Sequence, residues 1–387
     1  MHRVTLVFIL FLLIPDLYIY LVYVVRKTRK AVLHCLYWLP TLLLAAGYVY
    51  FMFLTGDNAM SNHTQAIGRL AITIMLFVFP KTIFMLCSLV GVLAHFIIRR
   101  CPRSPFTAIG LVLAVVSFFN ILYGTLAGIT RFDTKEVEYR SANIPEGFDG
   151  YRIVQISDIH IGSWQGNPDP IKQLVDLVNG QKPDLIVFTG DLVNQQSHEL
   201  DGFQEILSQL YAPDGVYSIL GNHDYHWQSP KAEIANLDYL IRQQKAMGWK
   251  LLNNEHDILH HKGDSIALIG VENDGEPPFS QFADLPQAMQ GTEGMFQILL
   301  SHNPTHWRRE VLPQSDISLM LAGHTHAMQG ILFGHSLAEL IYPEWRGMYY
   351  EGKRALYVNI GIGYVGLPFR FGAWPEITVL KLVREKE

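Results

Sequence analysis

The stretch IVQISDIHIG, residues 153–162, carries the pattern from which the fold can be inferred. An apolar run, Ile153-Val154-Gln155-Ile156, leads into Asp158 and His160, which stand two residues apart. Because side chains of a strand repeat with a period of two, an Asp and a His at this spacing beyond a strand end project to the same side. A carboxylate oxygen and a neutral imidazole nitrogen suit zinc, manganese or iron. Alone the motif is weak, since a polar turn after a strand has the same pattern.

The motif gains weight because four more buried strands end in Asp, Asn or His. These strand ends are Gly190-Asp191, Gly221-Asn222-His223-Asp224, His302 and Gly323-His324-Thr325-His326. Residues 169–180 have the apolar spacing of a helix, so strand, helix and strand predict a right-handed crossover between parallel strands. Ligands bind beyond the carboxyl ends of such strands. His306 has no such placement and is expected to face solvent.

Charge and cysteine usage differ sharply between the two parts of the 387-residue chain. Residues 1–130 contain ten basic and two acidic residues, a net charge of +8, and the whole chain has −5, so residues 131–387 carry −13. An acidic soluble part argues against nucleic-acid binding, and no such partner is expected. All three cysteines lie before residue 130, so residues 131–387 form neither a disulfide framework nor a thiolate metal site.

Four apolar segments, about 4–25, 31–54, 70–98 and 107–129, predict a membrane domain over residues 1–130. Each is long enough for a hydrocarbon core of ~30 Å, which takes roughly 20 helical residues. No small-residue cleavage site follows the first segment, which favours an uncleaved helix over a signal peptide. Asp16 and Lys81 lie within the spans and are expected to pair or snorkel.

The loops between these segments predict their orientation. Residues 26–30 and 99–103 are rich in Lys and Arg, whereas the loop from Thr55 to Gly68 has neither. By the positive-inside rule the two basic loops are cytoplasmic. The catalytic part, beyond a linker and first edge strand at 131–150, is then expected outside the cytoplasm, in a bacterial cell the periplasm. A re-entrant segment would reverse this placement.

The ordered motifs resemble those of the calcineurin-like metallophosphoesterase superfamily, and most closely its bacterial membrane-attached branch. Gly361-Ile362-Gly363, the segment Gly366 to Gly372 and Pro375-Glu376-Ile377 add to that likeness. The resemblance implies an α/β fold for residues 151–387. It is a four-layer α/β metallophosphoesterase sandwich of two central β-sheets flanked by helices. A four-helix transmembrane anchor precedes it.

The resemblance also implies a centre of two divalent metal ions, most suitably Mn, Fe or Zn. Asp191 would bridge the ions and His223 would be the catalytic general acid. The ligands would be Asp158, His160 and His326 at the first ion and Asn222, His302 and His324 at the second. Arg370 is a further candidate, for contact with substrate phosphate. The implied reaction is attack of metal-activated water on a phosphoester or pyrophosphate bond of a phosphorylated small molecule or a lipid-linked substrate.

Other interpretations stay open at this stage. The enzyme could be a general phosphodiesterase or phosphatase that uses the membrane only as a tether, or the domain could be a non-catalytic metal-binding scaffold or sensor. His223 favours catalysis, because scaffolds of this superfamily typically lack it. Ala327-Met328 replace the Gly-Gly common in the branch, and Ala is tolerated there where φ is negative. The apolar segment 331–350 predicts a lid, a lipid-facing flap or a loop packed over the sheet.

Overall fold

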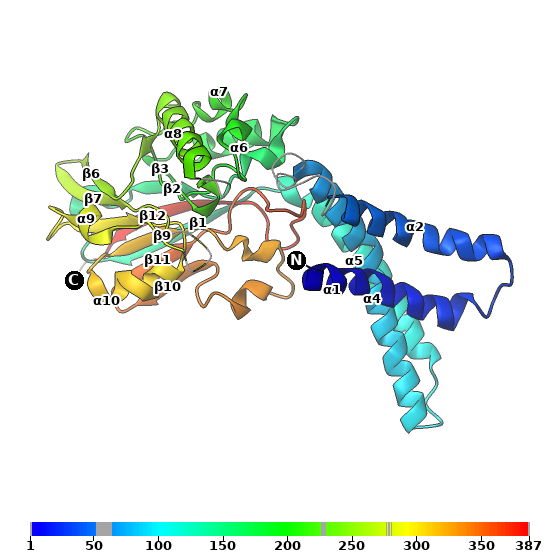
Figure 1. Cartoon of the computed structure of the whole chain (residues 1–387). Coiled ribbons are helices and arrows are strands. Elements are labelled where there is room, and N and C mark those ends of the chain that lie inside the picture. Colours follow the sequence, from blue (N-terminus) through cyan, green and yellow to red (C-terminus); the bar gives the residue numbers. More distant parts are fainter. Residues whose placement is uncertain are drawn as a thin grey trace. The chain divides into compact units, whose positions relative to one another are not determined.

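The protein folds into two compact units, seen in a computed structural model (Figure 1). The structure describes residues 2–51, 64–225, 230–275, 277, 279 and 281–385. One unit comprises the chain up to Ala127 together with the short segment Gly366–Phe369. The other comprises Gly128–Val365 and the chain from Arg370 onward. The segment 366–369 therefore leaves the second unit and packs with the first.

The first unit is built from long apolar helices. They are α1 His2–Ile19, which continues as a π-helical turn Tyr20–Val24, then α2 Ala31–Val49, α4 Thr64–Ile97 and α5 Ser104–Leu126. Three helical stretches, 31–49, 65–97 and 104–130, are long and apolar enough to cross a membrane, and 9–24 is a shorter apolar helix. These helices support a membrane protein. Helix α4 begins before the predicted start at residue 70, and positions 52–54 of the second predicted segment lie outside the described residues.

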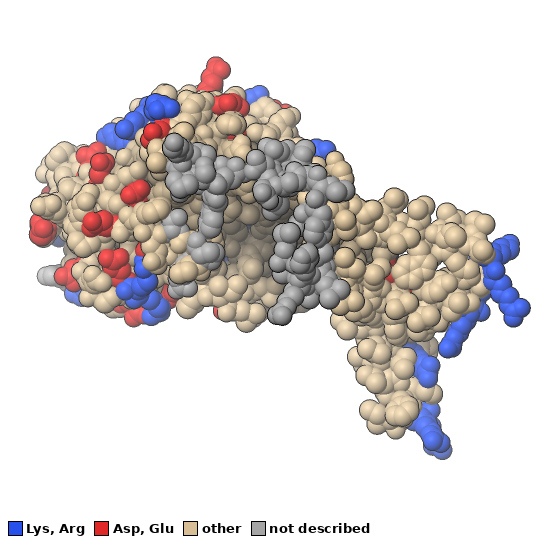
Figure 2. All heavy atoms as spheres, in the orientation of Figure 1, with Lys and Arg blue, Asp and Glu red and all other residues tan. Residues whose placement is uncertain are grey.

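The two charges predicted within the spans neutralise each other. Lys81 Nζ lies 2.7 Å from Asp16 Oδ1, and the Asp16 side chain is buried. The Tyr37 hydroxyl donates to the same oxygen at 3.1 Å, and the Thr41 hydroxyl donates to Oδ2. The expected pairing within the bundle is confirmed. Figure 2 shows basic side chains, in blue, at the far tips of this unit, whereas most of its visible surface between them is uncharged.

The second unit contains two six-stranded mixed sheets. The strand order is β1-β12-β2-β3-β4-β5 in the first sheet and β10-β11-β9-β8-β7-β6 in the second. Strands β2, β3 and β4 run parallel, as do β7, β8, β9 and β11. The strands are β1 Asp133–Ser141, β2 Arg152–Ile156, β3 Leu185–Phe188, β4 Val216–Ser218, β5 Lys250–Leu251, β6 Glu255–His261, β7 Asp264–Gly270, β8 Phe296–Leu300, β9 Leu319–Ala322, β10 Gly347–Glu351, β11 Arg354–Val358 and β12 Glu376–Arg384.

Alternation along the buried strands produces four layers. In β3, Leu185 and Val187 enter the core between the sheets, whereas Ile186 and Phe188 face a second core beneath helices. A third core covers the outer face of the second sheet. The helices are α6 Asp169–Gly180, α7 Gln204–Leu207 and α8 Pro230–Ala246 on the first sheet, and α9 Leu285–Met289 and α10 Leu312–Gln314 on the second. The predicted sandwich of two sheets flanked by helices is confirmed (Figure 1).

Helix α6 illustrates why the local sequence was informative. Its bounds, Asp169–Gly180, match the predicted range, and Pro170 occupies the first turn. The apolar positions Ile171, Leu174 and Val178 are all buried against the first sheet. The crossover that α6 forms carries the chain from β2 to the parallel neighbour β3. The carboxyl ends of β2 and β3 therefore meet at one edge, which positions the site.

Candidate metal centre

Five strand ends deliver the predicted ligands to one place. Asp158 and His160 follow β2, Asp191 follows β3, and Asn222 follows β4 in the first sheet. In the second sheet His302 follows β8, and His324 and His326 follow β9. Because each set of strands is parallel, their carboxyl ends lie at the same edge. The two sheets thus contribute side chains from opposite sides to a common centre.

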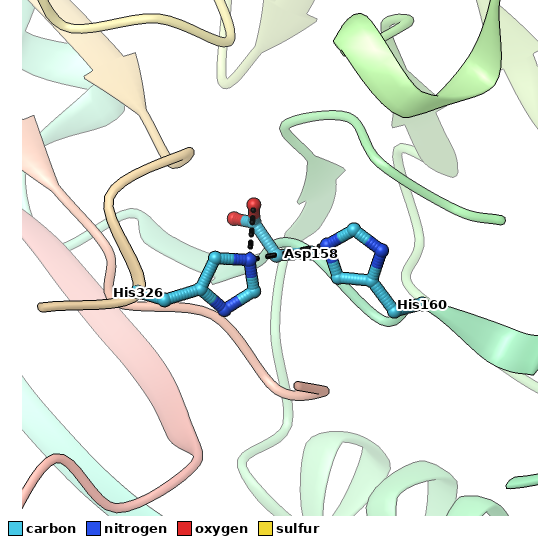
Figure 3. A group of neighbouring side chains, drawn as sticks. All are labelled: Asp158, His160 and His326. Carbon is cyan, nitrogen blue, oxygen red and sulfur yellow. Dashed lines mark hydrogen bonds and ion pairs between the residues drawn. The ribbon is translucent and has the colours of Figure 1, made fainter. Parts of the chain in front are cut away.

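Asp158, His160 and His326 form the first group of side chains (Figure 3). The Nε2 atoms of His160 and His326 face each other at 3.1 Å, and His326 Nε2 lies 3.2 Å from Asp158 Oδ1. Asp158 and His160 are fully buried. Three ligand atoms therefore converge from two loops that are far apart in the sequence.

The second group consists of Asp191, His302 and His324, with Asn222 beside it. His302 Nε2 lies 3.2 Å from Asp191 Oδ2, 3.2 Å from Asn222 Oδ1 and 3.3 Å from His324 Nδ1. The same Asp191 oxygen lies 3.6 Å from His160 Nε2 in the first group. One carboxylate oxygen thus stands between the two groups, where a bridging ligand is expected.

The donor set fits divalent metal ions. Each group brings imidazole nitrogens together with a buried carboxylate, and these are the nitrogen and oxygen donors that bind divalent ions in proteins. Nitrogen and oxygen ligands without thiolate suit Mn, Fe or Zn. Asp158, His160 and His326 would hold one ion, and Asn222, His302 and His324 the other, with Asp191 shared.

Charges at the centre favour cation binding. Burial raises the pKa of Asp191, but His302 and His223 reverse this shift and hold the pKa well below its usual value. Burial lowers the pKa of His160 well below 6.5 and that of His324 to about 3. Burial also lowers the pKa of His302, but Asp191 and Asp158 raise it to about 9. At neutral pH the carboxylates are anionic and His160 and His324 are neutral, which are the forms that bind metal, whereas His302 carries a proton that a bound metal ion would displace.

The ligands sit on strained backbone. Five non-glycine members of the centre have positive φ, a region that such residues seldom adopt: Asp158 at 53°, His160 at 45°, Asp191 at 60°, His324 at 75° and His326 at 49°. Such conformations cost on the order of 1–3 kcal/mol each and cluster at functional sites. Glycine permits the close packing around them, because a Cβ at Gly221 would collide with Asp191 and one at Gly323 with Asp158.

The departure at Ala327-Met328 has a physical cost. The expectation that Ala is tolerated at negative φ does not apply, because φ is 48° at Ala327, 44° at Met328 and 59° at Gln329. Three consecutive left-handed residues follow the last ligand, His326, where glycine would adopt the same backbone without strain. The large side chain of Met328 fits at this position because about half of its surface faces solvent.

His223 lies at the edge of the centre. Its Nδ1 bonds to the Asn194 carbonyl at 2.6 Å, which fixes the proton on Nδ1 in the neutral ring and leaves Nε2 for proton transfer. Its ring meets that of His160 edge-on at 4.9 Å, and its backbone N–H donates to Asp191 Oδ1 at 2.8 Å. His223 is therefore next to both groups and half-buried, unlike the fully buried ligand His160.

Two acidic residues hold the loops that carry His223 and Asp191. The buried Asp224 carboxylate accepts the backbone N–H groups of residues 191, 192, 193 and 221, so it anchors both loops rather than the His223 ring. Glu199 accepts the N–H groups of Asn194, Gln195 and Gln196 and so fixes the carbonyl that binds His223. Sequence reasoning assigned no role to Glu199, since it lies at no strand end.

Arg370, the candidate for contact with substrate phosphate, points into the interior of the second unit. The side chain is fully buried, and its nitrogens donate to the carbonyls of Gly363, Ala373 and Ile360. Nη2 also donates to His326 Nδ1 at 2.9 Å. Burial lowers the pKa of Arg370 to about 10, so it stays cationic at neutral pH. Arg370 therefore fixes the position of the His326 ring, a candidate metal ligand.

Two further residues differ from the sequence-based picture. His306, expected to face solvent, is fully buried and bonds to Ser301 and Glu310, each at 2.9 Å. Tyr342, far from any strand-end motif, places its hydroxyl 3.0 Å from His324 Nε2. Such a contact depends on the path of the segment after β9, which no local pattern reveals.

The two-sheet sandwich with this centre at its strand ends defines a metallophosphoesterase. Residues 151–328 match the family described as calcineurin-like phosphoesterase. Residues 2–129 match the family described as probable calcineurin-like phosphoesterase, transmembrane domain. The chain belongs to the calcineurin-like phosphoesterase family and carries a transmembrane region of the kind found with it.

Curated relatives agree with this assignment. The uncharacterized metallophosphoesterase YkuE of Bacillus subtilis is 34% identical over 65% of this chain and 85% of its own length. An uncharacterized metallophosphoesterase of Helicobacter pylori J99 is 28% identical over 89% of both chains. A zebrafish transmembrane protein with metallophosphoesterase domain is 32% identical over 71% of this chain. The chain spans 62% of the length of that zebrafish protein.

The centre predicts a metal-dependent rise in thermal stability that requires Asp191. At a free metal concentration about 100 times the Kd, binding stabilises the folded state by about 2.7 kcal/mol. For a domain of this size that raises Tm by roughly 5–10 °C. Thermal melts with Mn²⁺ and with EDTA measure the difference. Asp191→Asn should abolish most of it, whereas Asp169→Asn, at an exposed helix end, should keep it. Equal shifts in both variants would contradict the shared site.

The strained turn predicts that Met328→Gly stabilises the protein. Glycine removes a left-handed penalty of about 1–2 kcal/mol. It costs about 0.5–1 kcal/mol in chain entropy. The net gain of up to about 1.5 kcal/mol corresponds to a Tm rise of up to about 6 °C. Met328→Ala, which keeps the Cβ and the strain, serves as control. A glycine variant that melts no higher than the alanine variant would show that the turn is not strained.

Proposed function

We propose that the protein is a membrane-anchored phosphohydrolase with a dinuclear metal centre that hydrolyses a phosphoester or pyrophosphate bond. The observation that carries the proposal is the position of Asp191 Oδ2, 3.2 Å from His302 Nε2 and 3.6 Å from His160 Nε2. A single carboxylate oxygen that serves two ligand groups is the arrangement that two adjacent cations need. Mn, Fe or Zn fit the ligand set.

Some residues of the centre would bind the metal ions, and others hold those residues in position. Two cations held at the centre would neutralise charge on the phosphoryl oxygens and lower the pKa of an attacking water. Asp158 and Asp191 would supply the negative charge that holds the cations, and the histidines would supply nitrogen ligands, His302 after release of its proton. Asp224, Glu199 and Arg370 keep the loops and rings in place, so little reorganisation is needed when substrate binds.

His223 is proposed as the general acid. In hydrolysis a P–O bond to water forms while the P–O bond to the leaving group breaks, and the leaving oxygen needs a proton. With Nδ1 bonded to the Asn194 carbonyl, protonated His223 presents its second proton on Nε2. That position beside both ligand groups suits donation to the departing oxygen.

A pocket beside the second ligand group offers space for the rest of the substrate. It has a volume of about 580 Å³ and includes Asn303, Thr305, Arg308 and Tyr342 in its wall. Tyr342 also contacts His324, so the pocket adjoins the centre. Beside Arg308, the wall contains Arg309 and Glu344, so charged, hydroxyl, amide and aromatic groups can meet the rest of the substrate.

We propose a lipid-linked phosphate compound as the substrate class. The chain reaches the catalytic unit directly from α5, and Gly128 lies against the backbone of Arg370, the residue that holds His326. The centre is thus tied to the point where the chain leaves the membrane region. The basic loops 26–30 and 99–103 support a catalytic unit outside the cytoplasm, which in a bacterial cell is the periplasm.

The general-acid role predicts a selective kinetic loss in His223→Asn. With Mn²⁺, kcat on a diphospho-lipid should fall by about 10²–10⁴-fold. The loss on bis-p-nitrophenyl phosphate should be smaller, because p-nitrophenolate leaves without a proton. Bound metal, measured by inductively coupled plasma mass spectrometry, should stay unchanged.

A matched control for this kinetic test is His260→Asn, on an exposed strand position. It should keep wild-type rates on both substrates, while Asp191→Ala should lose both metal and turnover. Wild-type protein without metal-dependent turnover on bis-p-nitrophenyl phosphate, p-nitrophenyl phosphate or the diphospho-lipid would overturn the enzyme proposal. Equal losses on both leaving groups would overturn only the role of His223.

The orientation predicts the behaviour of reporters fused after Glu387. Alkaline phosphatase, which is active only after export, should be active in that fusion, and green fluorescent protein should stay dark when exported unfolded. Both fusions are made in bacterial cells and compared at equal expression. Fluorescence with inactive alkaline phosphatase would place the catalytic unit in the cytoplasm and contradict the positive-inside assignment.

A further inference from the structure

The segment 331–341, here called the flap, exposes large apolar side chains. Phe333 is 92% exposed, Leu340 83% and Leu337 68%. Leu332 and Ile341 also expose more than half of their surface. Exposed apolar side chains concentrated in so short a segment mark a surface that meets another apolar phase or partner.

The flap is a built structure, since its backbone groups are paired. Leu332 and His335 exchange backbone hydrogen bonds of 2.9 and 3.0 Å. Ser336 caps the following 3₁₀ turn, with its backbone N–H donating to Glu339 at 3.0 Å and its Oγ accepting from Ala338. Phe333 sits between these contacts with φ of 53°. A strained residue that is held outward by its neighbours is typical of a functional position.

The first residue of the flap, Ile331, lies near residues 128–131, which follow helix α5 in the chain. The Ile331 N–H donates to the Phe371 carbonyl at 2.8 Å. Phe371 follows Arg370, whose carbonyl would collide with a Cβ at Gly128. The Arg131 guanidinium stacks over the ring of Trp374, 4.7 Å from its centroid, and Trp374 lies three residues after Phe371. The flap therefore starts beside residues 128–131, which follow helix α5 directly.

The partner that fits this surface is the lipid bilayer. Helix α5 ends at Leu126 and β1 begins at Asp133, so only residues 127–132 connect them. At ~3.3–3.6 Å per residue, this connection spans at most roughly 20–25 Å. Apolar side chains of peripheral segments reach ~5–10 Å into the headgroup and acyl boundary. Because the flap starts beside residues 128–131, its apolar side chains are within reach of the boundary between headgroups and acyl chains.

We propose that the flap inserts Phe333, Leu337 and Leu340 into the bilayer interface and so presents the metal centre to lipid-linked substrates. Ser336 Oγ donates to the Ala327 carbonyl at 2.6 Å, next to the ligand His326. Tyr342, directly after the flap, contacts His324 at 3.0 Å. Insertion therefore holds the loop that carries His324 and His326 at the lipid surface. The substrate part of this inference rests on the proposed function, whereas the insertion does not.

Site-specific fluorescence tests the insertion without any catalytic readout. The full chain with Cys35, Cys87 and Cys101 replaced by serine receives one new cysteine, Phe333→Cys or Leu340→Cys, and an NBD label. Single copies are placed in phosphatidylcholine nanodiscs, with or without brominated lipid. We expect blue-shifted emission that brominated lipid quenches at both positions. Tyr211→Cys, at a 71% exposed aromatic residue, should give water-like emission that is not quenched.

Other outcomes of this experiment overturn the insertion. Water-like emission at Phe333 and Leu340 would mean that the flap faces solvent. Blue-shifted emission without quenching by brominated lipid would mean that the flap closes onto its own pocket, since a nanodisc with one copy excludes a second chain. Should the cysteine-free background fail to fold, the kinetic variants below test the same contact.

The kinetic test uses the double variant Phe333→Asp/Leu340→Asp, in which all three cysteines are kept. Loss of two large apolar side chains from the interface should lower kcat/KM on a diphospho-lipid in vesicles by about tenfold or more. Turnover of soluble bis-p-nitrophenyl phosphate should stay within twofold. Tyr211→Asp, the matched control, should change neither. Unchanged kcat/KM on the lipid, with wild-type turnover of it, would overturn lipid presentation. Absence of turnover on every substrate would instead refute the proposed function.

Discussion

The buried carboxylate of Asp191 is the constraint on which the rest of the centre depends. It lies at the end of β3, and one of its oxygens is close to a histidine of each ligand group. An anion in this position needs cations, because burial of an unpaired charge is costly. The positive charge of His302 offsets part of that cost, and two metal ions would do so more completely. The candidate ligands at the strand ends of both sheets are therefore grouped around this carboxylate.

Holding so many polar groups together requires strained backbone and a supporting shell. Five ligand residues adopt positive φ, and Asp224 fixes the loops after β3 and β4 through four backbone N–H groups. Arg370 holds His326 in place through a hydrogen bond to its Nδ1. The backbone of Arg370 also contacts Gly128. The segment that supports His326 is thus also in contact with a residue that follows α5 in the chain.

Much of the fold followed from local pattern. The range of α6 and the presence of the buried strands were predictable, because their apolar pattern directly reflects which faces are covered. The strand-end positions of the ligands followed from that same pattern. The roles of Arg370, Glu199 and Tyr342 were not predictable, since each depends on a hydrogen bond between segments that only the tertiary path brings together. The positive φ values after His326 were likewise invisible, because Ala and Met give no local sign of a left-handed turn.

The central claim is that one carboxylate holds two metal ions side by side. Electron paramagnetic resonance of the Mn²⁺-loaded full chain tests it most directly, because ions that share a bridge at ~3.5–4 Å are magnetically coupled. The account predicts two Mn²⁺ per chain and the multiline spectrum of an exchange-coupled pair. One Mn²⁺ per chain, or a six-line spectrum of isolated ions at full loading, would contradict it.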